Sequence, residues 1–279
     1  MLNKIIKWAE KEDNIHAVIL TGSRASKKPI DKFSDFDIAI FVNNQKKYIT
    51  DDLWIHKIAK IWVYIPETIN FNNYSIPTRL VIFKDGTNAD ISIYTLDILK
   101  KLISKKELPF ACELGYKVLL DKYKITKNIP KAPEKRKINT KPTQQEFLSA
   151  INIFFFEAYH VAKYLVRNDL WHAKFRDWTT KEYLLKMIEW HEQSTHNFNY
   201  NTFWHGKNIK LWTRKSTLDN LNKIFGHFNK SDSAKSLIYT INLFRQISKQ
   251  TAKNLNYKYP INIDKNITSF IKKLLIYKK

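Results

Sequence analysis

The chain has 279 residues with 44% hydrophobic and 14% aromatic content, enough for one large or two ordinary globular domains, and this excludes a disordered chain. Its 48 lysines and arginines outnumber 26 acidic residues, for a formal net charge of +22. A single cysteine, Cys112, excludes an internal disulfide, and the sequence has no apolar run long enough to span a bilayer, so we expect a soluble cytoplasmic protein.

The positive charge has two interpretations. It favours a polyanionic partner such as a nucleic acid or a nucleotide. Alternatively, lysine simply fills solvent-exposed positions, and weak affinity for nucleic acid at low salt accompanies this composition without being the function. Composition alone leaves both open.

The N-terminal half mixes helical and extended patterns. Residues 1–14 and 51–60 have the apolar spacing of helices, whereas apolar and β-branched runs predict strands at 15–20, 35–42, 61–65 and 116–122. We expect Pro66 to end the strand at 61–65. Residues 78–94 predict two further strands joined by a hairpin at Asp85-Gly86. Strands and helices mixed in this way predict a mixed sheet.

The C-terminal half has a different character. Residues 123–142 are basic, contain several prolines and lack periodicity, which is typical of a linker. Thr143 and Glu146 form a capping-box pattern that opens a helix. We expect helices at 144–167, 170–193, 216–228 and 233–256. The sequence therefore predicts an α+β fold, with a mixed-sheet domain over 1–142 and a helical bundle over 143–279.

Clustered aromatic residues in these helices are more typical of a core than of a binding platform. We expect the run from Phe154 to Phe156 to be buried. We expect the same of a second set at helical spacing: Trp178, Tyr183, Met187 and Trp190.

One stretch carries residues that a strand does not need. Gly22-Ser23 follows the first strand, and glycine at such a turn lets backbone N–H groups approach an anion. Asp35 and Asp37 are two residues apart at the start of the next strand, so both side chains point to one face. Paired carboxylates repel each other unless a cation lies between them, and the hard cation that also binds phosphates is magnesium.

A third carboxylate, Asp90, begins a later strand that can lie alongside. Each of these residues alone has an ordinary structural explanation, but a glycine turn followed by three strand carboxylates in this order favours a catalytic site. Three carboxylates that hold two metal ions beside a bound triphosphate form an active site suited to nucleotidyl transfer. The general base stays open between Asp90 and activation of the hydroxyl by metal alone.

These residues resemble the signature of the polymerase-β-like nucleotidyltransferase superfamily. More narrowly, residues 22–42, GSRASKKPIDKFSDFDIAIFV, resemble the aminoglycoside 6-adenylyltransferases. Four later segments are similar to parts of that family in the same order: HVAKYLVRNDLWHAK, EYLLKMIEWH, GKNIKLW and YKYPINIDKNIT. The resemblance covers nearly the whole chain.

The resemblance implies an N-terminal nucleotidyltransferase domain and a helical substrate-binding domain, with ATP and Mg²⁺, as two ions, between them. The implied reaction moves AMP from ATP to a hydroxyl of an aminoglycoside such as streptomycin and releases pyrophosphate. By motif, Gly22 and Ser23 hold the triphosphate, Arg24 contacts phosphate or braces the loop, and the metals lie among Asp35, Asp37 and Asp90.

Three further residues are candidates by position. Lys163 matches a family lysine that would neutralise triphosphate charge, although a surface lysine is an equal alternative. Glu67 is a candidate for a substrate amino or guanidino group, against the alternative of a solvated loop carboxylate. The family has an Asn-Glu-aromatic-aromatic run where residues 152–155 read Asn-Ile-Phe-Phe, and Glu157, one helical turn on, is the candidate replacement.

Two other functions remain open. The same chemistry could act on RNA or on a protein side chain, which the basic stretch from Lys122 to Lys141 supports weakly. A nucleic-acid-binding module with a decayed catalytic domain is the third, and the presence of all three carboxylates speaks against it. We expect ATP and a small polycationic acceptor as partners, no membrane, and no favoured nucleic-acid partner; the sequence does not indicate an oligomeric state.

Overall fold

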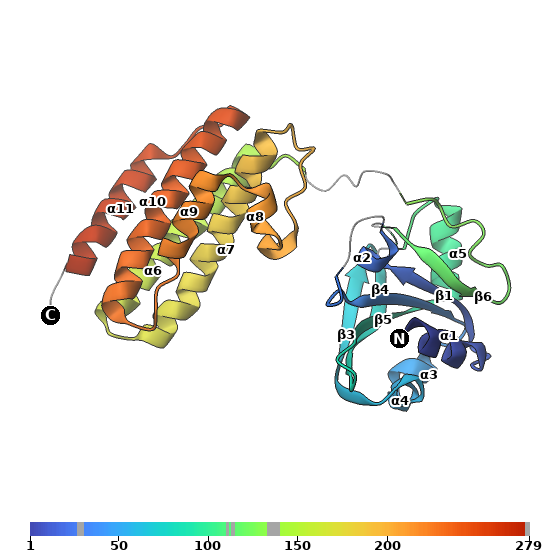
Figure 1. Cartoon of the computed structure of the whole chain (residues 1–279). Helices are drawn as coiled ribbons and strands as arrows, with labels where there is room; N and C mark the ends of the chain where they lie inside the picture. The colour runs from blue at the N-terminus through green and yellow to red at the C-terminus, as the bar shows by residue number, and fades with distance from the viewer. Residues whose placement is uncertain (27–30, 110–111, 113–114, 133–139, 277–279) are drawn as a thin grey trace. The chain divides into compact units, whose positions relative to one another are not determined.

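The computed structural model describes residues 1–26, 31–109, 112, 115–132 and 140–276. The chain divides into two compact units, Met1–Arg136 and Lys137–Lys279 (Figure 1). The first contains a mixed six-stranded sheet and the second is helical, so the predicted α+β fold is confirmed. Within the described ranges, no helix is long and apolar enough to cross a membrane.

The sheet has the strand order β3-β4-β5-β2-β1-β6. All neighbouring strands are antiparallel except β2 and β5, which are parallel. The six strands are β1 (Ile15–Thr21), β2 (Phe36–Val42), β3 (Ile61–Phe71), β4 (Tyr74–Phe83), β5 (Asn88–Thr95) and β6 (Lys117–Asp121). The predicted hairpin at Asp85-Gly86 joins β4 to β5 and is confirmed.

The two faces of the sheet pack against different layers. One face forms a core with residues of α1 (Leu2–Glu10), α3 (Lys46–Ile49) and α4 (Leu53–Ile58). The other face buries Ala39, Phe41 and Tyr94 against α5 (Leu96–Ser104) and the segment that contains Ile129. Because side chains alternate along a strand, Asp37 and Asp90 lie on this second face. A short helix, α2 (Gly22–Ala25), follows β1.

The expectation that Pro66 ends its strand is wrong. Strand β3 continues through Pro66, which pairs in register with Arg79, and extends to Phe71. The physical reason is the position of β3 at the edge of the sheet, where a residue without an N–H can face outward and break no ladder hydrogen bond.

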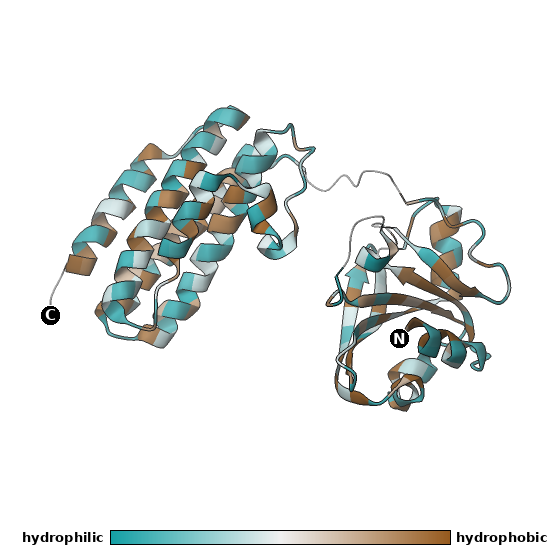
Figure 2. Cartoon of the chain, in the orientation of Figure 1, coloured by the Kyte–Doolittle hydropathy of each residue, from teal (hydrophilic) through white to brown (hydrophobic). Residues whose placement is uncertain are grey.

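The second unit is a bundle of long helices. These are α6 (Gln144–Val166), α7 (Leu170–Ser194), α9 (Lys215–Ile224), α10 (Lys230–Leu255) and α11 (Ile261–Ile276), with two short helices, η2 (Trp204–Gly206) and α8 (Ile209–Trp212), between α7 and α9. Hydrophobic and hydrophilic positions alternate along these helices (Figure 2), and the buried hydrophobic residues form one core cluster. The capping box of Thr143 and Glu146 is confirmed, whereas α11 was not among the predicted helices.

The expected burial of the aromatic residues is only partly right. Phe154, Phe155 and Met187 are buried in the core of the bundle, but Phe156 is 58% and Trp178 62% exposed. Successive helix positions turn by about 100°, so a run of three aromatic residues cannot face one core.

A buried histidine makes the stability of the bundle pH-dependent. His191 is 2% exposed, and neither ring nitrogen has a hydrogen-bond partner among the described residues. Burial lowers its pKa to about 4, with Arg214 adding to the decrease and Glu192 opposing it. The folded state therefore disfavours the protonated ring, and the linked stability is complete above pH 6.5 and is lost as the pH falls to 4.

We expect this linkage to amount to about 3 kcal/mol of unfolding free energy between pH 6.5 and 4. Urea unfolding at several pH values gives the unfolding free energy as a function of pH. The linkage is the difference between the pH slope of the wild type and that of His191→Leu, which cannot take up the proton. The exposed His56→Leu provides the matched control and should keep the wild-type slope. Equal slopes for wild type and His191→Leu would contradict the prediction.

Candidate active site

Two carboxylates meet where parallel strands run side by side. Asp37 of β2 and Asp90 of β5 are partners in register, and the strands are about 4.8 Å apart. Asp35 directly precedes β2 and is exposed, whereas Asp37 and Asp90 are half-buried. The apolar residues of β2 and β5 pack in the cores on the two faces of the sheet. Asp37 and Asp90 lie at the start of these strands, at the edge of the second face.

The electrostatics show that the acidic groups are close. Burial, as the larger cause, and the negative charges of Asp35 and Glu67 together raise the pKa of Asp90 to about 6. Carboxylates that destabilise one another in this way are stabilised by a cation.

Gly22 lies directly against Asp37. The glycine has φ +65°, a left-handed conformation that side chains disfavour. A Cβ atom built on Gly22 would lie 1.9 Å from Oδ2 of Asp37, so only glycine allows the carboxylate to occupy this place. Pairing of Thr21 with Asp37 in the β1–β2 ladder holds the two backbones in this register.

Arg24 braces the segment that leads to Asp35. Its Nε and Nη2 donate to the carbonyl oxygen of Ser34 at 2.9 and 2.7 Å, and its guanidinium lies 3.9 Å from the ring centroid of Phe36. Of the two roles open for Arg24, the structure shows this bracing contact. Ser23, next to it in α2, is exposed.

Glu67 lies on the same side of the sheet as the two strand carboxylates. It pairs in register with Thr78, which pairs with Ser92, two residues beyond Asp90 on β5. The alternation of side chains puts Glu67 and Asp90 on one face, and their electrostatic interaction agrees with this. Glu67 is exposed and belongs to β3, not to a loop.

Asn88 is a neighbour that the sequence analysis missed. Its Nδ2 donates to Oδ1 of Asp35 at 2.9 Å, across 53 residues of sequence. Asn88 is two residues before Asp90, so the period of a strand was the available signal. The sequence analysis gave Asn88 no role in the site.

The helical unit holds the other two candidates. Lys163 is half-buried on α6, with its Nζ 5.7 Å from the ring centroid of Tyr164. Glu157 on the same helix is 7% exposed, and Nη1 of Arg176 lies 3.1 Å from its Oε1. The charge of Glu157 is thus already balanced within the bundle.

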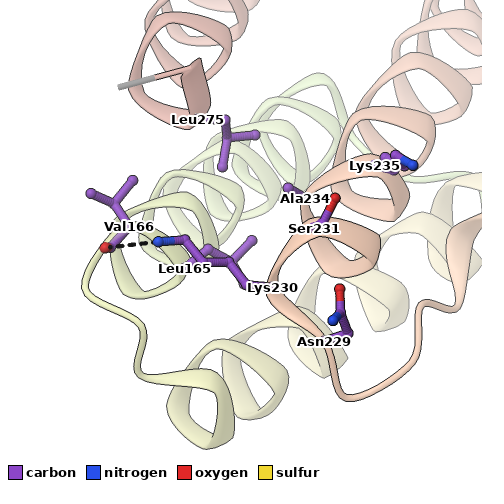
Figure 3. A pocket seen from close by; sticks show the side chains of 8 residues that line it. All are labelled: Leu165, Val166, Asn229, Lys230, Ser231, Ala234, Lys235 and Leu275. Atoms are coloured by element: carbon purple, nitrogen blue, oxygen red, sulfur yellow. Dashed lines mark hydrogen bonds between the residues drawn. The ribbon is translucent and has the colours of Figure 1, made fainter. Parts of the chain in front are cut away.

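A separate pocket of about 500 Å³ lies at one end of the bundle, among residues of α6, α10 and α11 (Figure 3). None of the predicted site residues lines it. The ammonium group of Lys230 donates to the carbonyl oxygen of Val166 beside this pocket.

Asp35, Asp37 and Asp90, here called the acidic cluster, suit a cation that is also bound by a substrate. Where the structure describes the chain, no group of three or more histidine, cysteine or acidic side chains forms a complete metal site. Mg²⁺ in phosphate sites, however, is held by only one or two carboxylates and takes its other ligands from phosphates and water. The repulsion that Asp35 and Glu67 exert on Asp90 is what such a cation would relieve.

Strand carboxylates beside a glycine turn on a mixed sheet define a class of enzyme, the nucleotidyltransferases. The match of the whole chain agrees with this class, because a model of the streptomycin adenylyltransferase family covers residues 1–274. The chain belongs to the streptomycin adenylyltransferase family.

Curated relatives resemble the chain over nearly their full length. An aminoglycoside 6-adenylyltransferase of Bacillus subtilis (strain 168) is 28% identical over 287 residues, covering 97% of this chain and 95% of the relative. One from Staphylococcus aureus is 26% identical over 283 residues, with 98% and 96% covered. The crystal structure of an aminoglycoside 6-adenyltransferase from Bacillus subtilis aligns with 99% of this chain and 98% of its own, at 21% identity and a TM-score of 0.49.

Proposed function

We propose that this enzyme transfers AMP from ATP to a hydroxyl group of an aminoglycoside, streptomycin or a close analogue, in a magnesium-dependent reaction that releases pyrophosphate. The observation that carries the proposal is the pairing in register of Asp37 and Asp90 beside the Gly22 turn. Family membership and the names of the relatives support adenylyl transfer as the reaction.

Asp35, Asp37 and Asp90 are the residues that would hold the metal, as two ions. Bound Mg²⁺ neutralises triphosphate charge and lowers the pKa of the attacking hydroxyl. Gly22 and Ser23 form the turn that would hold the triphosphate, with backbone N–H groups able to reach it because Gly22 has no side chain. Arg24 keeps this turn attached to the segment before β2.

Proton transfer falls to Asp90 in this proposal. It is half-buried in the middle of the acidic face and, as a β5 residue, is fixed by ladders to β2 and β4 on both sides. A carboxylate held in this way can accept the proton of an incoming hydroxyl without moving.

The remaining candidates would recognise the substrates. Glu67, exposed on β3 beside the acidic cluster, would bind an amino or guanidino group of the acceptor. Lys163 would approach the triphosphate. Glu157 is the second acceptor candidate, and a substrate cation there would have to compete with Arg176.

The experiment is an assay for pyrophosphate release with ATP, Mg²⁺ and a panel of aminoglycosides that includes streptomycin. We expect release that depends on both Mg²⁺ and an aminoglycoside, with AMP attached to the acceptor by mass spectrometry. Labelled RNA or labelled protein in place of a labelled aminoglycoside would identify a different acceptor. Failure of every aminoglycoside to stimulate release would refute the proposal.

Asn88 provides a test of the proposed metal site. We expect Asn88→Ala to raise the Mg²⁺ concentration for half-maximal activity about tenfold, because residues that orient metal ligands typically contribute 10- to 100-fold to affinity. The variant removes the donor that fixes Asp35 but leaves the carboxylate in place. A Mg²⁺ titration of the steady-state rate measures the change.

Asn70→Ala is the matched control for this prediction. Asn70 also makes a side-chain hydrogen bond on the sheet, at 3.0 Å from Oγ of Ser75, but in the β3–β4 hairpin. Its Mg²⁺ requirement should equal that of the wild type. If Asn88→Ala lowers the rate at every Mg²⁺ concentration by one factor, Asn88 does not act through the metal.

A further inference from the structure

One row of residues crosses five strands of the sheet and joins the two facing carboxylates to an apolar surface. Pairing in register links, in this order, Thr21 of β1, Asp37 of β2, Asp90 of β5, Leu80 of β4 and Ile65 of β3. Partners in register point their side chains to the same face of a sheet. The row therefore lies on the face that carries the acidic cluster, with β1 at one end and Ile65 at the other.

The apolar end of this row is open to solvent. In the neighbouring row, Val63 pairs with Ile82, which pairs with Asn88. Val63 is 52%, Ile65 55% and Ile82 40% exposed, and Leu80 is half-buried. We call Val63, Ile65, Leu80 and Ile82 the aliphatic platform.

The same two strands bury their apolar side chains elsewhere on this face. Ile76 of β4 is 1% exposed and packs with Ile69 of β3 in the core that α5 covers. The sheet thus has a covered half and an accessible half on one face, and the platform belongs to the accessible half. A group of large apolar side chains that stays accessible beside a catalytic cluster marks a ligand-binding surface.

The order of groups along the row indicates which substrate reaches the platform. In phosphoryl and nucleotidyl transfer the attacking and leaving oxygens lie roughly in line, on opposite sides of the reacting phosphorus. The proposed function places the triphosphate at Gly22, which follows Thr21 at the β1 end of the row. Pyrophosphate then leaves toward β1, and the acceptor hydroxyl arrives from the side of β4 and β3.

The reaction itself fixes where this hydroxyl must lie. Its oxygen forms a bond to the α-phosphorus while the bond from that phosphorus to pyrophosphate breaks, and its proton passes to Asp90. Neighbouring strands are about 4.8 Å apart, so Leu80 lies one strand and Ile65 two strands away from Asp90. An acceptor ring that carries the reacting hydroxyl therefore extends over the platform.

The side chains of the platform suit a sugar or cyclitol ring. Such a ring presents C–H groups on its faces, and these bury apolar area against aliphatic side chains. A nucleobase stacks on aromatic side chains instead, and none of the four platform residues is aromatic.

The charge beside the platform fits a cationic acceptor. Strand β3 contains no lysine or arginine, in a chain that has 48 of them. Its single charged residue is Glu67, two positions beyond Ile65 and on the same face. An amino group on a ring that rests on the platform is attracted to this carboxylate.

We infer that the aliphatic platform binds a ring of the aminoglycoside acceptor and orients its hydroxyl toward the α-phosphate. The inference rests on the proposed function and deepens it, because the family resemblance implies substrate binding by the helical domain, whereas the platform belongs to the N-terminal unit.

The test is steady-state kinetics of the full-length protein with Mg²⁺, in which ATP and the best aminoglycoside of the panel are varied separately. We expect Ile65→Ala to raise KM for the aminoglycoside about tenfold and to leave KM for ATP unchanged, because the shorter side chain loses apolar contact with the acceptor alone. Ile65→Val keeps a branched aliphatic side chain and should recover most of the loss.

Ile49→Ala is the matched control. Ile49 is 42% exposed in the same unit, but it belongs to α3, which packs on the other face of the sheet. This variant should keep both KM values of the wild type. Circular dichroism melting of all variants separates loss of binding from loss of fold.

An unchanged KM for the aminoglycoside in Ile65→Ala would overturn the inference. An equal rise of both KM values, or a rise for ATP alone, would also overturn it, since the platform would then have another occupant. Wild-type turnover separates this failure from failure of the proposed function. An active wild type with an unaffected Ile65→Ala variant contradicts only the platform, whereas a wild type that no aminoglycoside activates contradicts both.

Discussion

Asp37→Asn is expected to lower kcat/KM for adenylyl transfer by about three orders of magnitude, or roughly 4 kcal/mol of transition-state stabilisation. An amide has the shape of the carboxylate but lacks the negative charge that a metal ligand supplies. Asp37 shares its register position with Asp90, so its replacement removes one of the two facing carboxylates of the acidic cluster. Steady-state kinetics with ATP and the best aminoglycoside measures the loss.

The fold should survive this substitution. Asp37 is half-buried at the end of β2, and its backbone ladder to β1 and β5 is unaffected by the change. The thermal midpoint of Asp37→Asn should therefore match that of the wild type. Asp85→Asn is the matched control, because it neutralises an exposed carboxylate in the β4–β5 turn of the same sheet and should keep full activity. Wild-type kinetics in Asp37→Asn would contradict the metal assignment.

Local sequence patterns were sufficient for most of the sheet and for the spacing within the acidic motif. Runs such as residues 15–20 and 36–42 carry β-branched and aliphatic residues that pack in both cores, so their strands follow from composition. The strand period also predicted that Asp35 and Asp37 share a face, but β2 begins at Phe36, so Asp35 lies just outside the strand. Asp90 lies beside Asp37 because β2 pairs with β5, a strand distant in the sequence. The sequence could predict this pairing only as one arrangement among several.

What the local patterns missed depends on tertiary position. Pro66 is tolerated because β3 is an edge strand, and edge position is a property of the strand order. Asn88 and Glu67 meet the acidic cluster through hydrogen bonding and charge between strands distant in sequence. Ile267, Ile271 and Leu274 have the spacing of a helix and pack in the core of the bundle, so α11 could have been predicted. The lysines between them were instead interpreted as solvent-exposed residues without periodicity.

The contacts of Arg24 and Gly22 explain why the glycine turn and the aspartates occur together in one stretch. Arg24 fixes the carbonyl group just before Asp35, while the missing side chain of Gly22 leaves room for Asp37. Gly22 and Arg24, both in α2, thus position the acidic residues at the start of the next strand. These contacts join residues that are close in the sequence, because all of them belong to the connection between β1 and β2. The motif could therefore be recognised from the sequence.

Gly22→Ala is expected to lower activity at least 100-fold while reducing the unfolding free energy by only about 1–2 kcal/mol. The stability cost is that of placing an L-residue at φ +65°. The activity cost arises because the new Cβ would lie 1.9 Å from Oδ2 of Asp37, so the carboxylate must rotate away from its place beside Asp90. The side chain of Asp37 is flexible enough to do so, which limits the strain on the fold but removes the ligand.

Gly86→Ala separates these two costs. Gly86 has φ +77° in the β4–β5 turn, and a Cβ there meets no described atom within 4 Å. The two alanine variants should therefore lose similar stability in urea unfolding, while Gly86→Ala keeps wild-type kcat/KM and Gly22→Ala does not. A double variant, Gly22→Ala with Asp37→Asn, should be no less active than Asp37→Asn alone, because both changes disable the same carboxylate. Additive losses would show that Gly22 acts on a different part of the site, and the close approach to Asp37 would then not explain the glycine.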